Sequence, residues 1–83
     1  MKFELYTRVA LTEDLPQYQL CKGDIATIVE YHPVKNSEDG YSLEVFNAIG
    51  ETIAVITVAE SQIQSLMNNE VLHTRVLEPL LTN

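Results

Sequence analysis

A polar turn that leads into a strand with two apolar faces limits the possible folds of this chain most strongly. Gly23 and Asp24 form the turn, since glycine adopts backbone conformations that other residues avoid and aspartate hydrogen-bonds to nearby amides. The segment 25–32 that follows is rich in β-branched residues and predicts a strand. Its side chains alternate between two faces, yet Ile25 on one face and Ile28 on the other are both apolar. A strongly bent strand shared by two sheets, as in a small β-barrel, explains this pattern.

Four more segments have the composition of β-strands and are bounded by turn residues. The segment 41–47 alternates cleanly between apolar and polar residues. The segment 52–58 is an almost unbroken β-branched run, so we expect it to be the most buried strand. The loop 12–24 carries apolar residues and is expected to fold back over the open end of the barrel. The expected strands are 3–11 (its clearest part being 7–11), 25–32, 41–47, 52–58 and 64–66, with long loops at 12–24 and 33–40 and one helical turn at 59–63.

The length of the chain allows one small domain. Its 83 residues give no room for two independent cores. We expect a barrel over residues 1–66 and an extension over residues 67–83, whose pattern fits a short strand and a helix equally well. Leu72, Val76 and Leu80 make this extension more apolar than a small barrel can bury. It is therefore expected to dock on its own barrel, on a second copy or on a partner.

The order of the motifs is similar to that of a known family. Val9-Ala10-Leu11 is followed by the turn Lys22-Gly23-Asp24, the strand Tyr41-Ser42-Leu43-Glu44-Val45-Phe46, Gly50 and the run Ala54-Val55-Ile56-Thr57-Val58. Over residues 5–66 this order resembles a small bacterial family of SH3-like barrels, common in cyanobacteria and curated as a domain of unknown function. The resemblance implies an all-β, SH3-like five-stranded barrel with a long first loop and a C-terminal tail extension.

The resemblance implies no activity, but it bears on one residue and on the class of partner. Family members often have Gly where this chain has Ala26, so a backbone bulge at that position would have to accommodate a methyl group. Some members are encoded beside other small proteins, which suggests an antitoxin-like or accessory subunit.

The charge balance restricts the partners. Twelve acids against five bases give a formal charge of −7, which opposes binding to nucleic acid and to anionic membranes. It suits a soluble protein, or one whose partner carries basic patches. Cys21 has no second cysteine to pair with, no apolar run reaches the roughly 20 residues that span a bilayer, and the N-terminus lacks signal-peptide features. We therefore expect a cytoplasmic protein.

The sequence contains no catalytic signature. His32 and His73 are far apart and Cys21 has no neighbouring cysteine, so no metal site is expected. The carboxylate pairs Glu13-Asp14 and Glu38-Asp39 lie in polar loops, where we expect them to be solvated, whereas general acid–base catalysis needs a desolvated carboxyl group. The one enzyme-like alternative is a pocket in which Cys21 and His32 meet as a nucleophile and its base. We expect no catalytic residue, metal or cofactor.

Aromatic residues provide a specific binding hypothesis. Tyr18, Tyr31 and Tyr41 would line a groove between the two long loops, as aromatic residues do in SH3 domains that bind proline-rich peptides. Glu13 and Asp14 would then pair with an arginine of the ligand. Packing of most of these rings in the core is the interpretation that we favour over this groove.

Together these observations favour a non-enzymatic protein–protein interaction module, in the form of an antitoxin-like or accessory subunit. Its partner would be another protein, or a second copy bound through the tail. The alternatives are an accessory subunit or minor enzyme that uses a pocket near Cys21 and His32, and a nucleic-acid-associated SH3-like domain. The candidate partner-binding residues are Glu13, Asp14, Tyr18, Tyr31, Tyr41, Leu72, Val76 and Leu80.

Overall fold

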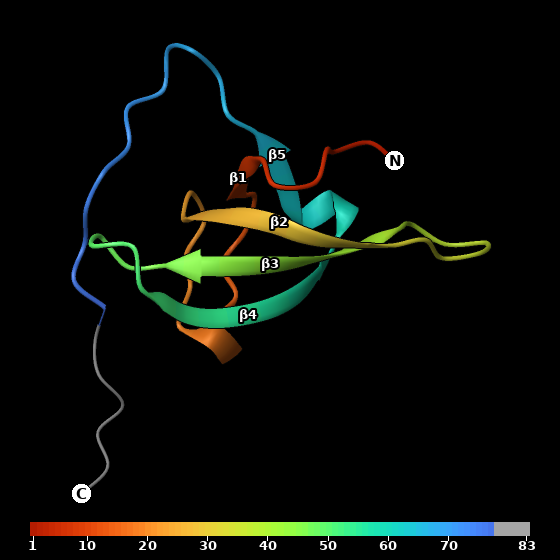
Figure 1. Cartoon of the computed structure of the whole chain (residues 1–83), viewed down its shortest axis with the longest axis horizontal. Coiled ribbons are helices and arrows are strands. Elements are labelled where there is room, and N and C mark those ends of the chain that lie inside the picture. Colours follow the sequence, from red (N-terminus) through yellow and green to blue (C-terminus); the bar gives the residue numbers. More distant parts are fainter. Residues whose placement is uncertain (78–83) are drawn as a thin grey trace, which may run out of the picture.

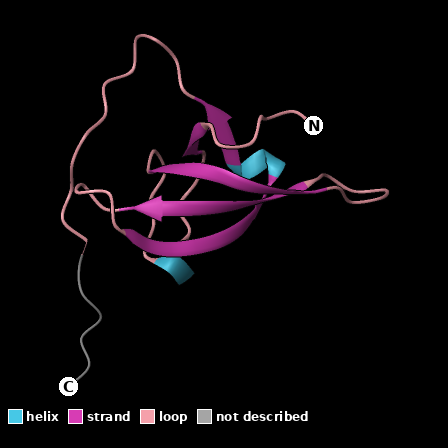
Figure 2. Cartoon of the chain, viewed as in Figure 1, coloured by secondary structure: helices cyan, strands magenta, loops and turns pink. Residues whose placement is uncertain are grey.

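The computed structural model describes residues 1–77, which form five β-strands and two single 3-10 turns and contain no α-helix (Figures 1 and 2). The all-β prediction is confirmed: β1 covers only the later part of the predicted segment 3–11, and each other strand lies within one residue of its predicted bounds. The strands are β1 (Arg8–Leu11), β2 (Ile25–His32), β3 (Gly40–Phe46), β4 (Thr52–Ala59) and β5 (Ile63–Ser65), and the 3-10 turns are η1 (Pro16–Tyr18) and η2 (Glu60–Gln62).

The strands form one antiparallel sheet in the order β4-β3-β2-β1-β5. β2 is central, because its first residues pair with β1 and its later residues pair with β3. The register of the β2–β3 ladder shifts between Ile28 and Glu30. A shift of this kind bends a strand and increases its twist. Ala26, in contrast, pairs regularly with Val9, so the bulge lies further along β2 than the family resemblance suggests.

The sheet does not close into the barrel that the sequence suggests. β5 pairs with β1, with Leu11 opposite Ile63, and within residues 1–77 no ladder joins β5 to β4. η2 leads directly from the end of β4 to β5, which is only three residues long. β5 uses one edge for its ladder with β1, and its other edge pairs with no strand of the described residues. The prediction of a closed barrel is therefore wrong, and β4 and β5 remain edge strands.

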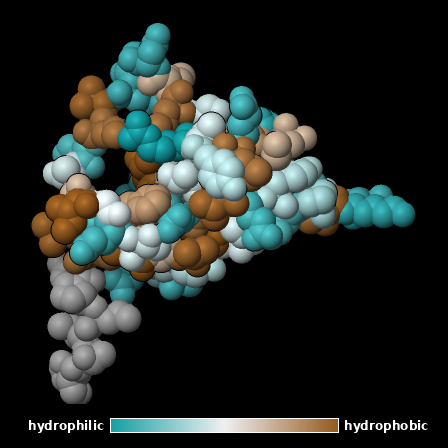
Figure 3. Space-filling view, in the orientation of Figure 1, coloured by the Kyte–Doolittle hydropathy of each residue, from teal (hydrophilic) through white to brown (hydrophobic). Residues whose placement is uncertain are grey.

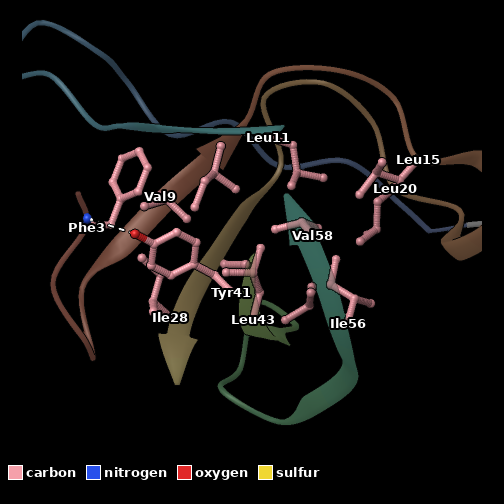
Figure 4. Close-up of a cluster of buried hydrophobic side chains, with 13 residues drawn as sticks. Phe3, Val9, Leu11, Leu15, Leu20, Ile28, Tyr41, Leu43, Ile56 and Val58 are labelled. Carbon is pink, nitrogen blue, oxygen red and sulfur yellow. Dashed lines mark hydrogen bonds between the residues drawn. The ribbon is translucent and has the colours of Figure 1, made fainter. Parts of the chain in front are cut away.

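One apolar core lies on the inner face of the sheet (Figure 4). Its most deeply buried side chains lie on β1, β2 and β3. They are Val9, Ile28, Tyr41 and Leu43. Leu15 and Leu20, from the loop 12–24, are also buried and form an isolated bridge with each other. The predicted apolar underside of that loop is thus confirmed.

β4 is not the most buried strand, contrary to the prediction from its β-branched run. Only Ile56 and Val58 are buried in it, whereas Ile53, Val55 and Thr57 are exposed. β3, which lies between β2 and β4, has four buried residues, against two in β4. β-branched residues favour extended backbone at the edge of a sheet as much as at its centre, so composition alone does not distinguish the two.

We expect a short strand or a helix after β5. The described residues 67–77 form neither. We call these residues the strap. Its only internal backbone hydrogen bond closes a turn, from the Glu70 amide to the Met67 carbonyl oxygen at 3.1 Å. The strap then runs back past the β3–β4 connection (blue in Figure 1). Within residues 1–77, no helix is long and apolar enough to cross a membrane.

Candidate functional site

Tyr41 belongs to the core and does not line a peptide groove. Its side chain is fully buried, and its ring packs edge to face on Phe3 with the ring centres 5.5 Å apart. The Tyr41 hydroxyl accepts hydrogen bonds from the backbone amides of Lys2 and Phe3 at 3.1 and 3.3 Å, and it donates to Glu60 Oε2 at 3.2 Å (Figure 4). A buried tyrosine needs a partner for its hydroxyl, and here the N-terminal segment supplies it.

Tyr31 is half-buried beside Tyr41 and organises the loop between β2 and β3. Its hydroxyl donates to Asp39 Oδ2 at 2.6 Å, and Asp39 Oδ1 accepts from the Val34 amide at 3.0 Å. The hydrogen bond to Asp39, with burial and the Asp39 charge, raises the pKa of Tyr31 to about 12. The same bond, with that from Val34, lowers the pKa of Asp39. The hydroxyl of Tyr31 is therefore already engaged within the chain.

The remaining groove residues lie on the loop 12–24 and support its shape. Asp14 Oδ1 accepts from the Lys22 amide at 2.8 Å, and Glu13 Oε2 accepts from Gln62 Nε2 at 3.3 Å. Tyr18 is exposed on η1 and takes part in neither of the ring contacts that Tyr41 makes. Since Tyr41 is buried, the structure does not bring the three tyrosines together on one surface.

Cys21 and His32 lie at opposite ends of β2. Cys21 is exposed in the turn that precedes the strand, and the strand of eight residues is about 25 Å long. His32 ends the strand, where its Nε2 lies 2.7 Å from Ser42 Oγ. The structure therefore does not assemble the proposed nucleophile–base pair. Within the described residues, no group of three or more His, Cys, Asp or Glu side chains is placed to hold a metal ion.

A clasp between Arg75 and Asp24 fixes the strap to the turn before β2. The Arg75 guanidinium donates through Nε to Asp24 Oδ1 at 3.0 Å, through a second nitrogen to Asp24 Oδ2, and to the Gln19 carbonyl oxygen at 3.3 Å. Asp24 Oδ2 also accepts from the Cys21 amide at 2.8 Å. Gly23 makes this turn possible with a φ of +92°, which non-glycine residues rarely adopt.

The electrostatics of the clasp favour a charged Asp24. Burial raises the pKa of Asp24, but the hydrogen bonds from Arg75 and from the Cys21 amide, together with the Arg75 charge, outweigh burial and lower it. Paired planar groups of this kind form the strongest charge-assisted hydrogen bonds. Sequence reasoning identified the Gly23-Asp24 turn but missed Arg75 as its partner, because 51 residues separate Arg75 from Asp24.

The strap encloses a cavity of about 700 Å³ against the sheet, visible as a hollow in Figure 3. Leu72 and Leu77 line it from the strap, and Phe46 and Ile53 line it from β3 and β4. Val71 also lies at this cavity although it is 91% exposed, whereas Val76, which is 88% exposed, does not line it. Two of the predicted tail residues, Leu72 and Val76, thus lie on the strap, and Leu80 lies outside the described residues.

A second group of exposed apolar residues lies on the β3–β4 hairpin, and we call it the hairpin patch. Its members are Phe46, Ile49, Ile53 and Val55. Ile49 is 79% exposed in the turn, and Val55 is 65% exposed in the middle of β4. The sequence does not predict this patch, because the β-branched run 52–58 indicates a buried strand. The position of Ile49 in a four-residue hairpin turn is a signal that points to its exposure.

Comparison with known proteins identifies a family but no activity. The sequence model of a family described as "Domain of unknown function (DUF4926)" matches residues 5–65. No curated protein and no solved structure matches the chain.

Proposed function

The chain belongs to this family of domains of unknown function, and we propose that it is a non-enzymatic protein–protein interaction module. In this proposal it is an antitoxin-like or accessory subunit that works bound to another protein. Its strand order and long first loop support the finer assignment to the SH3-like folds, in a form that stays open between β4 and β5. A single exposed cysteine suits a reducing compartment, and we place the protein in the cytoplasm.

The observation that carries this proposal is a continuous apolar surface made by the strap and the hairpin patch. Phe46 and Ile53 line the same cavity as Leu72 and Leu77, so the two groups are neighbours. Val71, Val76 and Ile49 extend the surface outward, where nothing in residues 1–77 covers them. Contiguous exposed apolar surface with a polar rim is typical of protein-binding sites.

The way in which the strap is held also supports a binding role. Between Glu70 and Arg75 it makes no backbone hydrogen bond to the sheet among the described residues, and the clasp fixes only its far end. A segment with so few contacts opens at low free-energy cost. A partner can therefore contact the strap and the hairpin patch together, with Leu72 and Val76 among the contact residues.

Affinity capture from the native host with matched variants tests the proposal. Ile49→Asp and Val71→Asp place a charge on the proposed surface, and Val34→Asp places the same charge on an exposed apolar residue of the β2–β3 loop. We expect wild type and Val34→Asp to retain one protein at near-equal molar ratio, and the other two variants to lose most of it. Retention of the same partner by Ile49→Asp and Val71→Asp would show that the surface is not the binding site. Sedimentation of the purified protein distinguishes this partner from a second copy.

A further inference from the structure

Within the part of the chain that the structure describes, the outer edge of β4 pairs with no other strand. Every second residue of an edge strand directs its N–H and C=O groups away from the sheet. β4 pairs only with β3, and within residues 1–77 no backbone hydrogen bond outside that ladder involves Thr52 to Val58. The free edge of β4 lies along the lower side of the sheet in Figure 1. Its eight residues make it as long as β2, the central strand.

Beyond Ile53, β4 also lacks the devices that keep edge strands from pairing. Natural edge strands carry charged residues, prolines or bulges, or they are short. β4 reads Thr-Ile-Ala-Val-Ile-Thr-Val-Ala, with no charge and no proline. Its one register shift lies near its start, where Ile53 is the extra residue between Thr52, which pairs with Phe46, and Ala54, which pairs with Val45; from Ala54 to Ala59 the pairing with β3 is regular. Such an edge is suited to accept another strand.

The charges around this edge determine which strand it accepts. Residues 40–66 contain three acids, Glu44, Glu51 and Glu60, and no lysine or arginine. Glu51 directly precedes β4 and Glu60 directly follows it, while Glu44 lies opposite Val55 on β3. A second copy paired antiparallel in full register would place Glu51 beside Glu60 of the other copy at both ends. Like charges opposite one another destabilise such pairs.

We propose that β4 binds an extended segment of a basic partner protein by strand addition, with Lys or Arg residues of that segment beside Glu51 and Glu60. Main-chain hydrogen bonds supply the affinity in this mode of recognition, and side chains at alternate positions supply the specificity. The segment spans about ten residues, or roughly 30 Å, and is β-branched between its basic ends. This inference rests on the proposed function and names the chemistry of its partner.

A designed peptide tests the inference with the full-length protein. The probe has about ten residues, alternating Thr and Val between two terminal lysines, and its backbone nitrogens are methylated along one edge so that only the other edge can pair. One control peptide carries glutamates in place of the lysines, and a second is methylated along both edges. Binding is measured by ¹⁵N chemical-shift titration, which also locates the contact. We expect the largest shifts in Thr52 to Ala59, about tenfold weaker binding of the glutamate peptide, and no binding of the doubly methylated one.

Two protein variants separate the edge from the general charge of the molecule. Val55→Lys places a cation on the exposed face of β4 and should abolish binding, whereas Val34→Lys makes the same charge change in the β2–β3 loop and should leave binding within about twofold. Equal binding of the lysine and glutamate peptides would overturn the proposal, as would shifts outside β4 or equal loss in both variants. Concentration-dependent self-pairing through β4 would assign the edge to a second copy and would also overturn it.

Failure of strand addition at β4 can be distinguished from failure of the proposed binding function. Arg75→Ala releases the strap but leaves β4 intact, so it should not change binding of the peptide. If the peptide fails while affinity capture succeeds, the partner contacts the strap and the hairpin patch without strand addition. If the peptide binds while capture fails, the edge is functional and the strap is not.

Discussion

The hydroxyl group of Tyr41 holds the N-terminal segment against the core. It accepts from the amides of Lys2 and Phe3 and donates to Glu60, while Phe3 covers the edge of its ring. The alternation of Tyr41, Leu43 and Val45 along one face of β3 indicates this inward position from the sequence. The peptide-groove hypothesis gave more weight to the residue type than to this alternation, and it therefore placed Tyr41 on the surface.

Tyr41→Phe tests the contribution of this hydroxyl. We expect the free energy of unfolding to fall by about 1–2 kcal/mol, because the substitution removes the partner of buried backbone amides while it keeps the ring. Urea denaturation measures the change, and hydrogen exchange at Phe3 should accelerate. Tyr18→Phe is the control, since Tyr18 is exposed on η1. A loss in Tyr18→Phe as large as that in Tyr41→Phe would contradict the assignment.

At the scale of elements, the sequence predicts well which segments form strands, but it predicts poorly which strands pair with one another. Strand bounds depend on local signals, namely turn residues such as Gly23 and Gly50 and the β-branched runs between turns. For this reason most predicted bounds agree with the structure. Whether a strand lies at the centre or the edge depends on contacts distant in sequence. β4 is an edge because β5 pairs with β1, and nothing in the composition of β4 reports that. The clasp between Asp24 and Arg75 depends on distant residues in the same way.

The clasp should open in acid. The pKa of Asp24 is lowered in the folded protein, so its contribution is fully present above the ordinary pKa near 3.8 and is lost as the pH falls through the lower folded value. We expect the backbone of residues 70–77 to gain picosecond-to-nanosecond motion as the pH falls through the lowered pKa of Asp24, as measured by ¹⁵N heteronuclear NOE. Asp24→Asn should show this motion already at pH 7. A strap whose order is the same at pH 7 and pH 3, while the core stays folded, would refute the role of the clasp.

At the scale of the whole molecule, a complete core coexists with an uncovered apolar surface. All members of the core cluster lie between Phe3 and Ile63, and the strap contributes none of them. The exposed apolar residues gather instead on the strap and the hairpin patch. The molecule thus separates the part that folds it from the part that we propose binds a partner.

Deleting residues 67–83 should therefore leave the sheet folded. We expect the truncated protein to keep its β-sheet circular dichroism signal and a cooperative unfolding transition, because none of the described residues 67–77 belongs to the core. The same truncation should weaken capture of the partner. Unfolding of the truncated protein would mean that the strap belongs to the core, and the division into a folded part and a binding part would then fail.

Hydrogen exchange of the captured complex tests the central claim most directly. The account predicts that, relative to the free protein, amides of residues 46–58 and 67–77 become protected when the partner is bound, while those of the central strands β2 and β3 before residue 46 change little. Protection confined to the loop 12–24 or to the β2–β3 loop would contradict the claim that the strap and the β3–β4 hairpin form the binding surface.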